Sequence, residues 1–279
     1  MAGCLYVVAT PIGNISDITL RALDTLKEVD FIAAEDTRVT IKLLNKYEIK
    51  KKIISYHEHS AKECADGIIE RILNGESCAI VTDAGMPCIS DPGELLVKLC
   101  YENNITVKVV PGASAVVSAL AISGLNTSRF AFEGFLSVTK KQRFEHLKNI
   151  ANYTHTLIFY EAPHKLIATL KDMLEYLGDR KISICRELTK VYEEVIRTTI
   201  SGAISYYENK TPRGEYVLVI EGAKQKENKE ITIEDAVKQV LTLIEQGEKP
   251  TNACKIVAKE TGHKKSDLYS TMQENFKSK

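Results

Sequence analysis

The chain has 279 residues, of which 44% are hydrophobic and 27% charged, and its 37 basic and 37 acidic residues balance. This length is sufficient for two domains, and the composition is typical of a globular protein. Because the charges balance, the overall charge does not indicate a nucleic-acid partner, and binding to nucleic acid would need a local basic patch. No apolar run approaches the roughly 20 residues that a membrane-spanning helix needs.

The seven cysteines are scattered singly, at positions 4, 64, 78, 88, 100, 185 and 254, and no CxxC pair occurs. This pattern supports neither a zinc site nor a disulfide framework. The N-terminal residues run directly into a strand-like segment, without the charge pattern of a signal peptide. We therefore expect a cytoplasmic protein.

Strand-like and helical segments alternate along the first 124 residues. Strands are predicted at residues 5–9, 31–34, 53–56, 78–81 and 106–110, and helices at 18–26, 40–46, 94–100 and 115–122. This alternation predicts a parallel sheet flanked by helices, in an α/β domain spanning residues 1–124. Ser16 is expected to cap the first helix. Asp91 is expected to be the N-cap of the helix at 94–100, with Pro92 in the first helical position.

The turn at residues 82–93 is the richest in chemistry, because it holds two Asp, two Gly and two Pro after a buried strand. Open α/β sheets bind ligands at the carboxyl ends of their strands. Gly85 permits a close approach of backbone to a ligand, and Asp83 can accept hydrogen bonds from a ribose or an amine. The alternative is a helix-capping loop that binds nothing.

Three further turns follow predicted strands, at Pro11, Asp36 and Gly112. If the strands are parallel, these turns and the Asp83 turn all face the same edge of the sheet. Their convergence predicts a ligand cleft there.

A second run of strand signals begins after residue 124. Strands are predicted at residues 130–135, 156–160, 182–185 and 215–221, with a basic helix at 139–150. The weak alternation at 191–199 suits an antiparallel strand. These segments predict a second α/β domain with a mixed sheet, spanning residues 125–222.

Beyond a polar stretch at residues 223–230, which has the composition of a linker, the strand signals stop. Thr232 and Asp235 resemble a capping box, and three short helices are predicted in a unit spanning residues 231–279. Leu268, Met272 and Phe276 are expected to face its interior. Tight turns between short helices resemble a helix-turn-helix unit. Residues 223–279 carry 11 Lys and 9 Asp or Glu, so the net charge of +2 is weak for nucleic-acid binding.

Several catalytic motifs are absent. The chain has no GxxxxGK[ST] phosphate loop and no GxGxxG after its first strand, which weighs against nucleotide hydrolysis and a standard dinucleotide fold. HExxH and GxSxG are also missing. His57 and His59 lack further ligands nearby, so no metal site is predicted. A cleft of turns and carboxylates suits a cofactor that carries its own reactive group.

Six motifs, in order along the chain, closely resemble the ribosomal RNA small subunit methyltransferase I family, which belongs to the tetrapyrrole-methylase-like, class III methyltransferases. These motifs are LYVVATPIGN at 5–14, AEDTR at 34–38, TDAGMPCISDPG at 82–93, PGAS at 111–114, FYEAPH at 159–164 and RELTK at 186–190. The resemblance covers essentially the whole chain. Its first turn reads Thr-Pro-Ile-Gly-Asn where tetrapyrrole enzymes have a Gly-Pro-Gly-Asp type of loop. That departure favours the RNA branch over the porphyrinoid branch.

The resemblance implies S-adenosylmethionine as methyl donor, bound between two α/β domains. It also implies transfer to the ribose 2′-oxygen of a cytidine in the decoding region of 16S rRNA, on the 30S subunit, by a homodimer. For that donor we predict the following cofactor-binding residues: Pro11, Asp83, Ala84, Gly85, Met86, Gly112, Ser114, Ala115, Tyr160, Glu161, Leu188 and Glu215.

Asp36 is the candidate catalytic base, because it ends the second strand and should face the same cleft as Asp83. Arg38 is expected to hold the adjacent RNA phosphate. The competing interpretation is that Asp36 only orients Arg38, or that the two form a surface ion pair. The remaining predicted RNA contacts are Arg186, Lys264, Lys265 and Tyr269. Arg186 has the alternative of a structural ion pair with Glu187.

Two other functions are compatible with the residues. One is a tetrapyrrole or diphthamide-type methyltransferase on the same fold, against which the Glu-Asp-Thr-Arg motif and the helical tail argue. The other is a non-catalytic RNA-binding protein that keeps the fold. The intact turns at 82–93 and 111–114 argue against a lost cofactor site.

Overall fold

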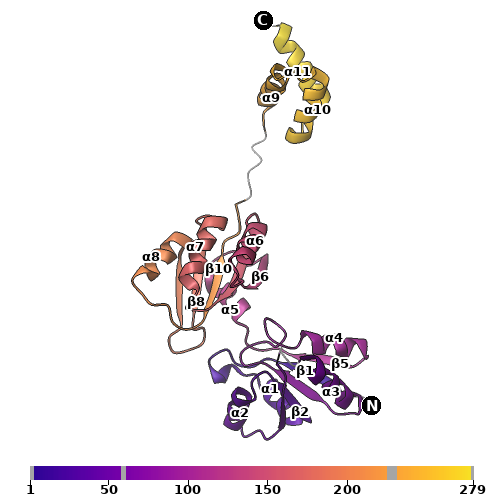
Figure 1. Ribbon diagram of the computed structural model, residues 1–279, viewed down its shortest axis with the longest axis vertical. Coiled ribbons are helices and arrows are strands. Elements are labelled where there is room, and N and C mark those ends of the chain that lie inside the picture. Colours follow the sequence, from indigo (N-terminus) through magenta and orange to yellow (C-terminus); the bar gives the residue numbers. More distant parts are fainter. Residues whose placement is uncertain (1–2, 58–60, 225–230, 278–279) are drawn as a thin grey trace. The chain divides into compact units, whose positions relative to one another are not determined.

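The computed structural model describes residues 3–57, 61–224 and 231–277 (Figure 1). The chain divides into two compact units, Met1–Ala223 and Lys224–Lys279. Within the described residues, no helix is both long enough and apolar enough to cross a membrane.

The first sheet is entirely parallel, as the alternation of strands and helices predicts. Its order is β3-β2-β4-β1-β5, and each neighbouring pair is parallel. The turns after β1, β2, β4 and β5 therefore leave the same edge of the sheet, which confirms their predicted convergence. The strands are β1 (Cys4–Val8), β2 (Phe31–Ala34), β3 (Lys52–Ser55), β4 (Cys78–Val81) and β5 (Thr106–Val110).

Helices cover both faces of this sheet. Side chains of α3 and α4 pack on one face around Phe31 and Leu5, and those of α1 and α2 pack on the other around Ile32 and Val8. Helix α3 has no counterpart among the predicted elements. The helices are η1 (Ile15–Asp17), α1 (Leu20–Glu28), α2 (Thr37–Lys46), α3 (Ala61–Leu73) and α4 (Glu94–Glu102).

Two predicted helix caps are wrong. Thr19, and not Ser16, caps α1 by accepting a hydrogen bond from Ala22, because a 3-10 turn precedes that helix. Helix α4 has Gly93 as its N-cap, at a φ of 139° and with no side-chain capping bond. Asp91 is therefore not a cap, and Pro92 lies outside the helix.

The second sheet is mixed, with the order β6-β7-β10-β8-β9. Strand β6 is parallel to β7, whereas β10 is antiparallel to β7 and β8, and β9 is antiparallel to β8. The expected mixed sheet and its antiparallel edge strand are thus confirmed. The strands are β6 (Phe130–Phe135), β7 (Thr156–Glu161), β8 (Lys181–Arg186), β9 (Glu194–Thr199) and β10 (Tyr216–Ile220).

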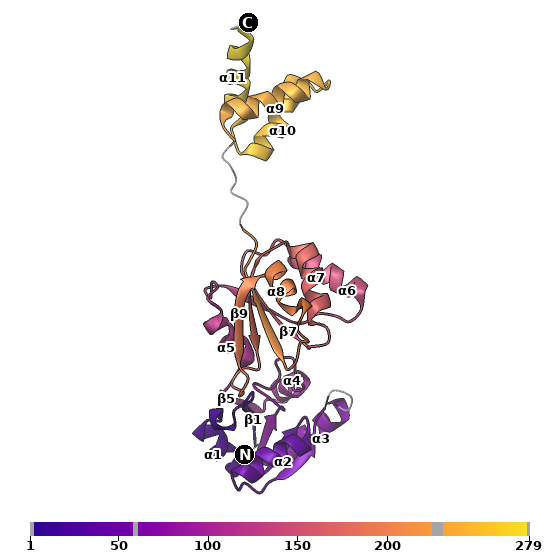
Figure 2. The same ribbon diagram turned by 90° about the vertical axis from the view of Figure 1, so that its left-hand side faces the viewer.

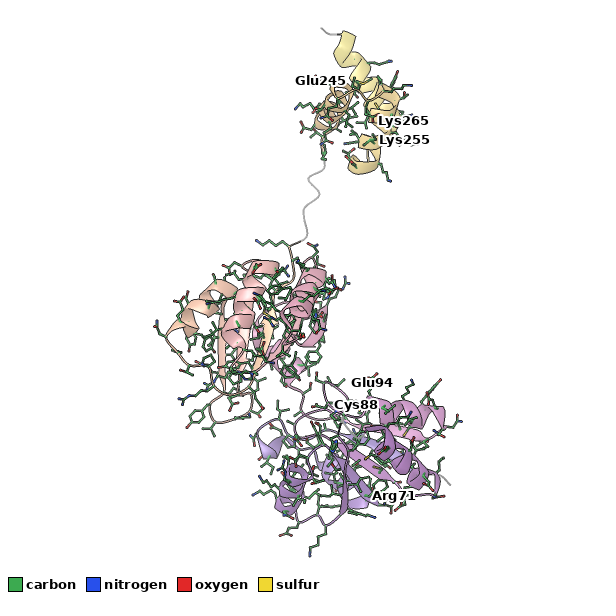
Figure 3. All side chains as sticks on the ribbon, in the orientation of Figure 1. Arg71, Cys88, Glu94, Glu245, Lys255 and Lys265 are labelled. Carbon is green, nitrogen blue, oxygen red and sulfur yellow. The ribbon has the colours of Figure 1, made fainter. Side chains whose placement is uncertain are left out.

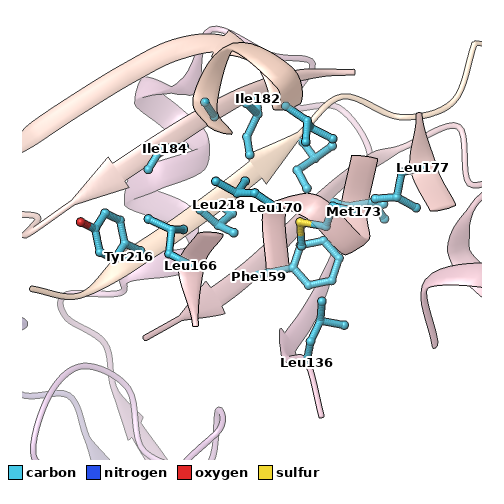
Figure 4. Close-up of a cluster of buried hydrophobic side chains, with 14 of the residues drawn as sticks. Leu136, Phe159, Leu166, Leu170, Met173, Leu177, Ile182, Ile184, Tyr216 and Leu218 are labelled. Atoms are coloured by element: carbon cyan, nitrogen blue, oxygen red, sulfur yellow. The ribbon is translucent and has the colours of Figure 1, made fainter. Parts of the chain in front are cut away.

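Helix α5 lies on one side of these strands, and α6 and α7 lie on the other (Figure 2). Phe159 of β7 packs with Leu170 and Met173 of α7 in the larger core (Figure 4). Helices α7 and α8 were not among the predicted elements. The helices are α5 (Ala115–Ser123), α6 (Lys140–Ile150), α7 (Leu166–Leu177) and α8 (Ile200–Glu208).

The C-terminal unit consists of α9 (Ile233–Glu245), α10 (Pro250–Thr261) and α11 (Lys265–Lys277). Thr232 caps α9 by accepting from the Asp235 backbone, and Gly262 ends α10 at a φ of 77°, as predicted. Leu268 and Met272 are buried in a core of their own. The Phe276 side chain, His59 and residues 225–230 of the expected linker lie outside the described part of the chain.

Candidate cofactor cavity and its surroundings

A cavity of about 360 Å³ opens at the carboxyl edge of the first sheet, where the turns after its strands meet residues of the second sheet. The turn at 82–93 forms one wall, the start of α5 another, and the ends of β7 and β10 a third. The walls are mainly apolar. The lining residues are Ile12, Ala84, Gly85, Met86, Ile89, Ser90, Asp91, Ser114, Ala115, Phe135, Tyr160, Glu161, Ala162, Pro163, Cys185, Leu188, Glu215, Tyr216 and Val217.

Nine of the twelve residues predicted to bind a cofactor line this cavity: Ala84, Gly85, Met86, Ser114, Ala115, Tyr160, Glu161, Leu188 and Glu215. Pro11, Asp83 and Gly112 do not. Gly112 lies so close to Ala9 that an added Cβ would come within 2.8 Å of the Ala9 Cβ, so its role is close packing behind the cavity. The Asp83 carboxylate accepts a hydrogen bond from the Asp36 backbone at 3.2 Å.

The backbone at Gly85 shapes the cavity floor. Gly85 has a φ of 88° and pairs with Thr10 through two backbone hydrogen bonds of 2.9 and 3.1 Å. A Cβ at this position would lie 3.2 Å from Ile12 Cγ2 and 3.7 Å from the Ala113 carbonyl. Only glycine lets the turn adopt this conformation without strain. Cys88 in the same turn and Glu94 just after it are labelled in Figure 3.

The start of α5 lines the cavity through Ser114 and Ala115. Ser114 is the N-cap of this helix, and its side chain makes no capping hydrogen bond to the N–H groups of the first turn. Together with the helix dipole, such donors attract a carboxylate or phosphate.

Tyr160 is held in place by aromatic neighbours. Its ring centroid lies 4.9 Å from that of Phe132 and 5.4 Å from that of Phe135. Burial, together with the nearby negative charge of Asp91, raises the pKa of Tyr160 to about 12. The phenol therefore stays protonated at neutral pH. Glu161, which is 4% exposed, is occupied by protein donors, since it accepts from Thr169 Oγ1 at 2.5 Å and from the Ala162 backbone at 2.8 Å.

Several acidic side chains lie beside the cavity, near the buried hydroxyl of Thr82. Thr82 Oγ1 donates to Glu35 Oε2 at 2.5 Å. Asp91 and Ser90 line a second cavity of about 800 Å³ as well as the first. Burial and the negative charges of Glu35 and Asp83 raise the pKa of Asp91 to about 6.

Asp36 and Arg38 form an exposed ion pair, with Arg38 Nη2 at 2.5 Å from Asp36 Oδ2. Asp36 also accepts from the Arg38 backbone at 2.8 Å, as the N-cap of α2. These hydrogen bonds from Arg38 lower the pKa of Asp36 to about 2. A carboxylate with so low a pKa is a weak proton acceptor at neutral pH. The geometry therefore favours the interpretation in which Asp36 orients Arg38, and the base role remains a prediction.

Arg186 is tied into the second sheet. It donates to the Arg213 carbonyl at 2.7 Å and lies 3.6 Å from a Glu194 oxygen. The alternative of an ion pair with Glu187 is not realised, because Glu187 instead bonds Lys190 at 3.0 Å and accepts from the Glu215 backbone. The predicted contact of Arg186 with RNA remains a prediction.

In the C-terminal unit, Lys265 (labelled in Figure 3) and Tyr269 line a surface cavity of about 500 Å³, whereas Lys264 is exposed beside it. Three hydroxyl groups share that cavity, from Thr251, Ser266 and Ser270. Lys265 is the first residue of α11, so the basic and hydroxyl side chains gather at a helix N-terminus.

Comparison with known proteins identifies this arrangement. The family model of tetrapyrrole (corrin/porphyrin) methylases matches residues 4–204. A protein from Halalkalibacterium halodurans named ribosomal RNA small subunit methyltransferase I is 48% identical over 96% of this chain and 94% of its own length. The chain belongs to the ribosomal RNA small subunit methyltransferase I family.

A relative of the same name from Thermotoga maritima is 49% identical over 79% of this chain and 99% of its own length. About a fifth of this chain thus has no counterpart in that protein. Among solved structures, a diphthine synthase superposes with a TM-score of 0.61 at 14% identity, covering 79% of this chain and 90% of its own. A uroporphyrin-III-C-methyltransferase from Thermus thermophilus gives a TM-score of 0.56 at 18% identity, covering 78% and 94%. These structures share the fold, which confirms the predicted fold class.

Members of this family use S-adenosylmethionine as methyl donor, and the cavity fits that group. Its volume lies in the range of small-molecule sites, its apolar walls suit an adenine, and the α5 N-terminus suits a carboxylate.

Ten of the lining residues were not predicted to bind the cofactor: Ile12, Ile89, Ser90, Asp91, Phe135, Ala162, Pro163, Cys185, Tyr216 and Val217. A signal for some of them was present in the sequence, because Ile89, Ser90 and Asp91 belong to the turn at 82–93. The expectation that Asp91 caps a helix concealed its other role.

Proposed function

We propose that this chain transfers a methyl group from S-adenosylmethionine to the ribose 2′-oxygen of a cytidine in the decoding region of 16S rRNA, acting on the 30S subunit in the cytoplasm as a homodimer. The observation that carries the proposal is the cavity, in which nine residues predicted from the sequence motifs meet at the carboxyl edge of the parallel sheet. Sequence identity of 48% to a relative named for small-subunit ribosomal RNA supports the substrate class.

When bound, the donor supplies an electrophilic methyl group on a positively charged sulfur. The protein positions the reactants and excludes water. The Gly85 backbone and the first turn of α5 would hold the donor, and Met86 and Leu188 would shield it from solvent. Arg38 would contact an RNA phosphate, with Asp36 fixing its guanidinium.

A second copy would cover part of the edge strand β5. Val109 on this strand is 57% exposed and Val107 is 36% exposed. Apolar edge strands are usually covered, because they otherwise pair with other chains. This exposure supports the proposed homodimer, which sedimentation at several protein concentrations tests.

The experiment that tests the function is methyl transfer from labelled donor. The purified protein is expected to label 30S particles and to leave a porphyrinoid substrate unlabelled, with the label recovered as a 2′-O-methylated cytidine. Labelling of the porphyrinoid would support the rival tetrapyrrole activity. Donor binding without transfer to any RNA would contradict the assignment as an RNA methyltransferase.

Replacing Arg38 by alanine is expected to weaken binding to 30S particles about tenfold and to reduce the salt dependence of binding by about one phosphate contact. Asp36→Asn should have a smaller effect in the same direction, since it removes only the group that orients the guanidinium. Single-turnover rates with saturating particles check the assignment. A large rate loss for Asp36→Asn with RNA affinity kept would instead support Asp36 as the base.

A further inference from the structure

Asp91 occupies a place that local sequence rules do not explain. Gly93 takes the N-cap position of α4, so the Asp91 carboxylate is free of capping and lines both cavities. The turn that carries it is strained, because Cys88 and Ser90 have φ values of 69° and 64°, in the left-handed region. Such backbone is uncommon for residues other than glycine and persists where the surroundings enforce it. The turn holds Asp91 between the donor cavity and the space beside it.

The hydroxyl group behind Asp91 already has a partner. Thr82, which is 3% exposed, donates its one hydroxyl proton to Glu35 at 2.5 Å. The effect of Thr82 on Asp91 is to lower the pKa of that carboxyl, so Thr82 favours the ionised form, which a base needs before it can accept a proton.

Burial and the charges around Asp91 act against the ionised form. Burial raises the pKa of Asp91, and repulsion from Glu35 and Asp83 raises it further, to about 6. Cys88 and Tyr160 also lie near Asp91, and both are neutral at physiological pH because burial raises their pKa values to about 11 and about 12. His57, Glu94 and Lys98 also line the second cavity. A carboxylate in this setting is a stronger base than an exposed one.

We propose that Asp91, which lines both the donor cavity and the cavity beside it, is the general base that accepts the proton of the ribose 2′-hydroxyl. The 2′-oxygen forms a bond to the methyl carbon, the carbon–sulfur bond breaks with its electron pair remaining on sulfur, and the proton passes from the 2′-oxygen to Asp91. The proposal rests on the proposed function, because the hydroxyl belongs to that substrate.

The test compares Asp91→Asn with the wild-type protein in single-turnover methylation of 30S particles across pH 5 to 9, together with donor affinity by calorimetry. A base must be ionised to act, so the wild-type rate should rise with pH through about 6 and level off above it. Asp91→Asn should lower the rate on the plateau at least about 100-fold and remove the acidic limb, with donor affinity within about threefold. Thr82→Val should shift that limb to higher pH, because Thr82 lowers the pKa of Asp91. Asp24→Asn, an exposed carboxylate on α1, is the matched control.

A second readout needs no methyl transfer. Infrared difference spectra between wild type and Asp91→Asn, titrated with pH, report protonation of this carboxyl directly, and a midpoint near pH 6 is expected.

Three results would overturn the proposal. The first is an Asp91→Asn variant that keeps the wild-type rate or the acidic limb. The second is a loss confined to donor affinity, which makes Asp91 a donor-binding residue. The third is a carboxyl that titrates near pH 4. If the wild-type protein does not methylate 30S particles, the proposed function itself is contradicted. If the wild-type protein is active and one of these three results is obtained, only the assignment of Asp91 as the base fails.

Discussion

Gly85→Val is expected to abolish donor binding while leaving the protein folded. At a φ of 88°, any side chain is strained, at a cost of about 1–2 kcal/mol. The new Cβ would lie 3.2 Å from Ile12 Cγ2, and its two methyl groups would occupy the neighbouring space in the cavity. Calorimetry should show at least about a 100-fold loss of affinity, which corresponds to about 2.7 kcal/mol. Circular dichroism and thermal unfolding check that the fold persists.

The control for this experiment is Gly178→Ala, because Gly178 also has a positive φ, of 79°, but nothing within 4 Å of an added Cβ. This substitution should lower the free energy of unfolding by about 1–3 kcal/mol and leave donor affinity unchanged. Comparing the two variants separates backbone strain from occlusion of the cavity. An unchanged donor affinity in Gly85→Val would remove this turn from the donor site.

Deleting residues 231–279 should leave the donor dissociation constant unchanged and lower kcat/KM for 30S particles at least about tenfold. The body of the chain is a compact unit with its own cores, so it should fold without the three helices. A tethered RNA-binding unit raises the effective concentration of the substrate near the cavity. Activity should be reduced and not lost, because every residue that lines the donor cavity belongs to the unit Met1–Ala223.

The full-length double variant Lys264→Ala/Lys265→Ala locates the effect within the tail. It should weaken binding to 30S particles and lower the salt dependence by one to two phosphate contacts. Lys238→Ala, an exposed lysine of α9 that pairs with Asp235, serves as the matched control and should bind normally. If the truncated protein methylates 30S particles as well as the full chain does, the tail is not a docking unit.

Local patterns along the chain are enough to predict the parallel sheet, the mixed second sheet and the helical tail. Buried strands such as Cys78–Val81 are continuous apolar runs in the sequence. The glycines and aspartates of the turn at 82–93 are also visible in the sequence alone. All strands of a parallel sheet end at the same edge. The turns that carry Gly85 and Ser114 can therefore be predicted to lie near one another without knowledge of the strand order. Local pattern also predicted the caps at Thr232 and Gly262.

The partners of the carboxylates around the site depend on tertiary contacts, which no local pattern contains. Asp83 and Asp91 lie in one turn, yet Asp91 lines the cavity while Asp83 bonds the backbone after β2. Asp36 lies at the end of the second strand, as predicted, but its carboxylate accepts a hydrogen bond from Arg38. A local rule places Asp91 as a helix cap, but the strained backbone at Cys88 and Ser90 turns it elsewhere. Side-chain direction depends on contacts between residues distant in sequence, such as Thr82 with Glu35, and these are absent from any short-range pattern.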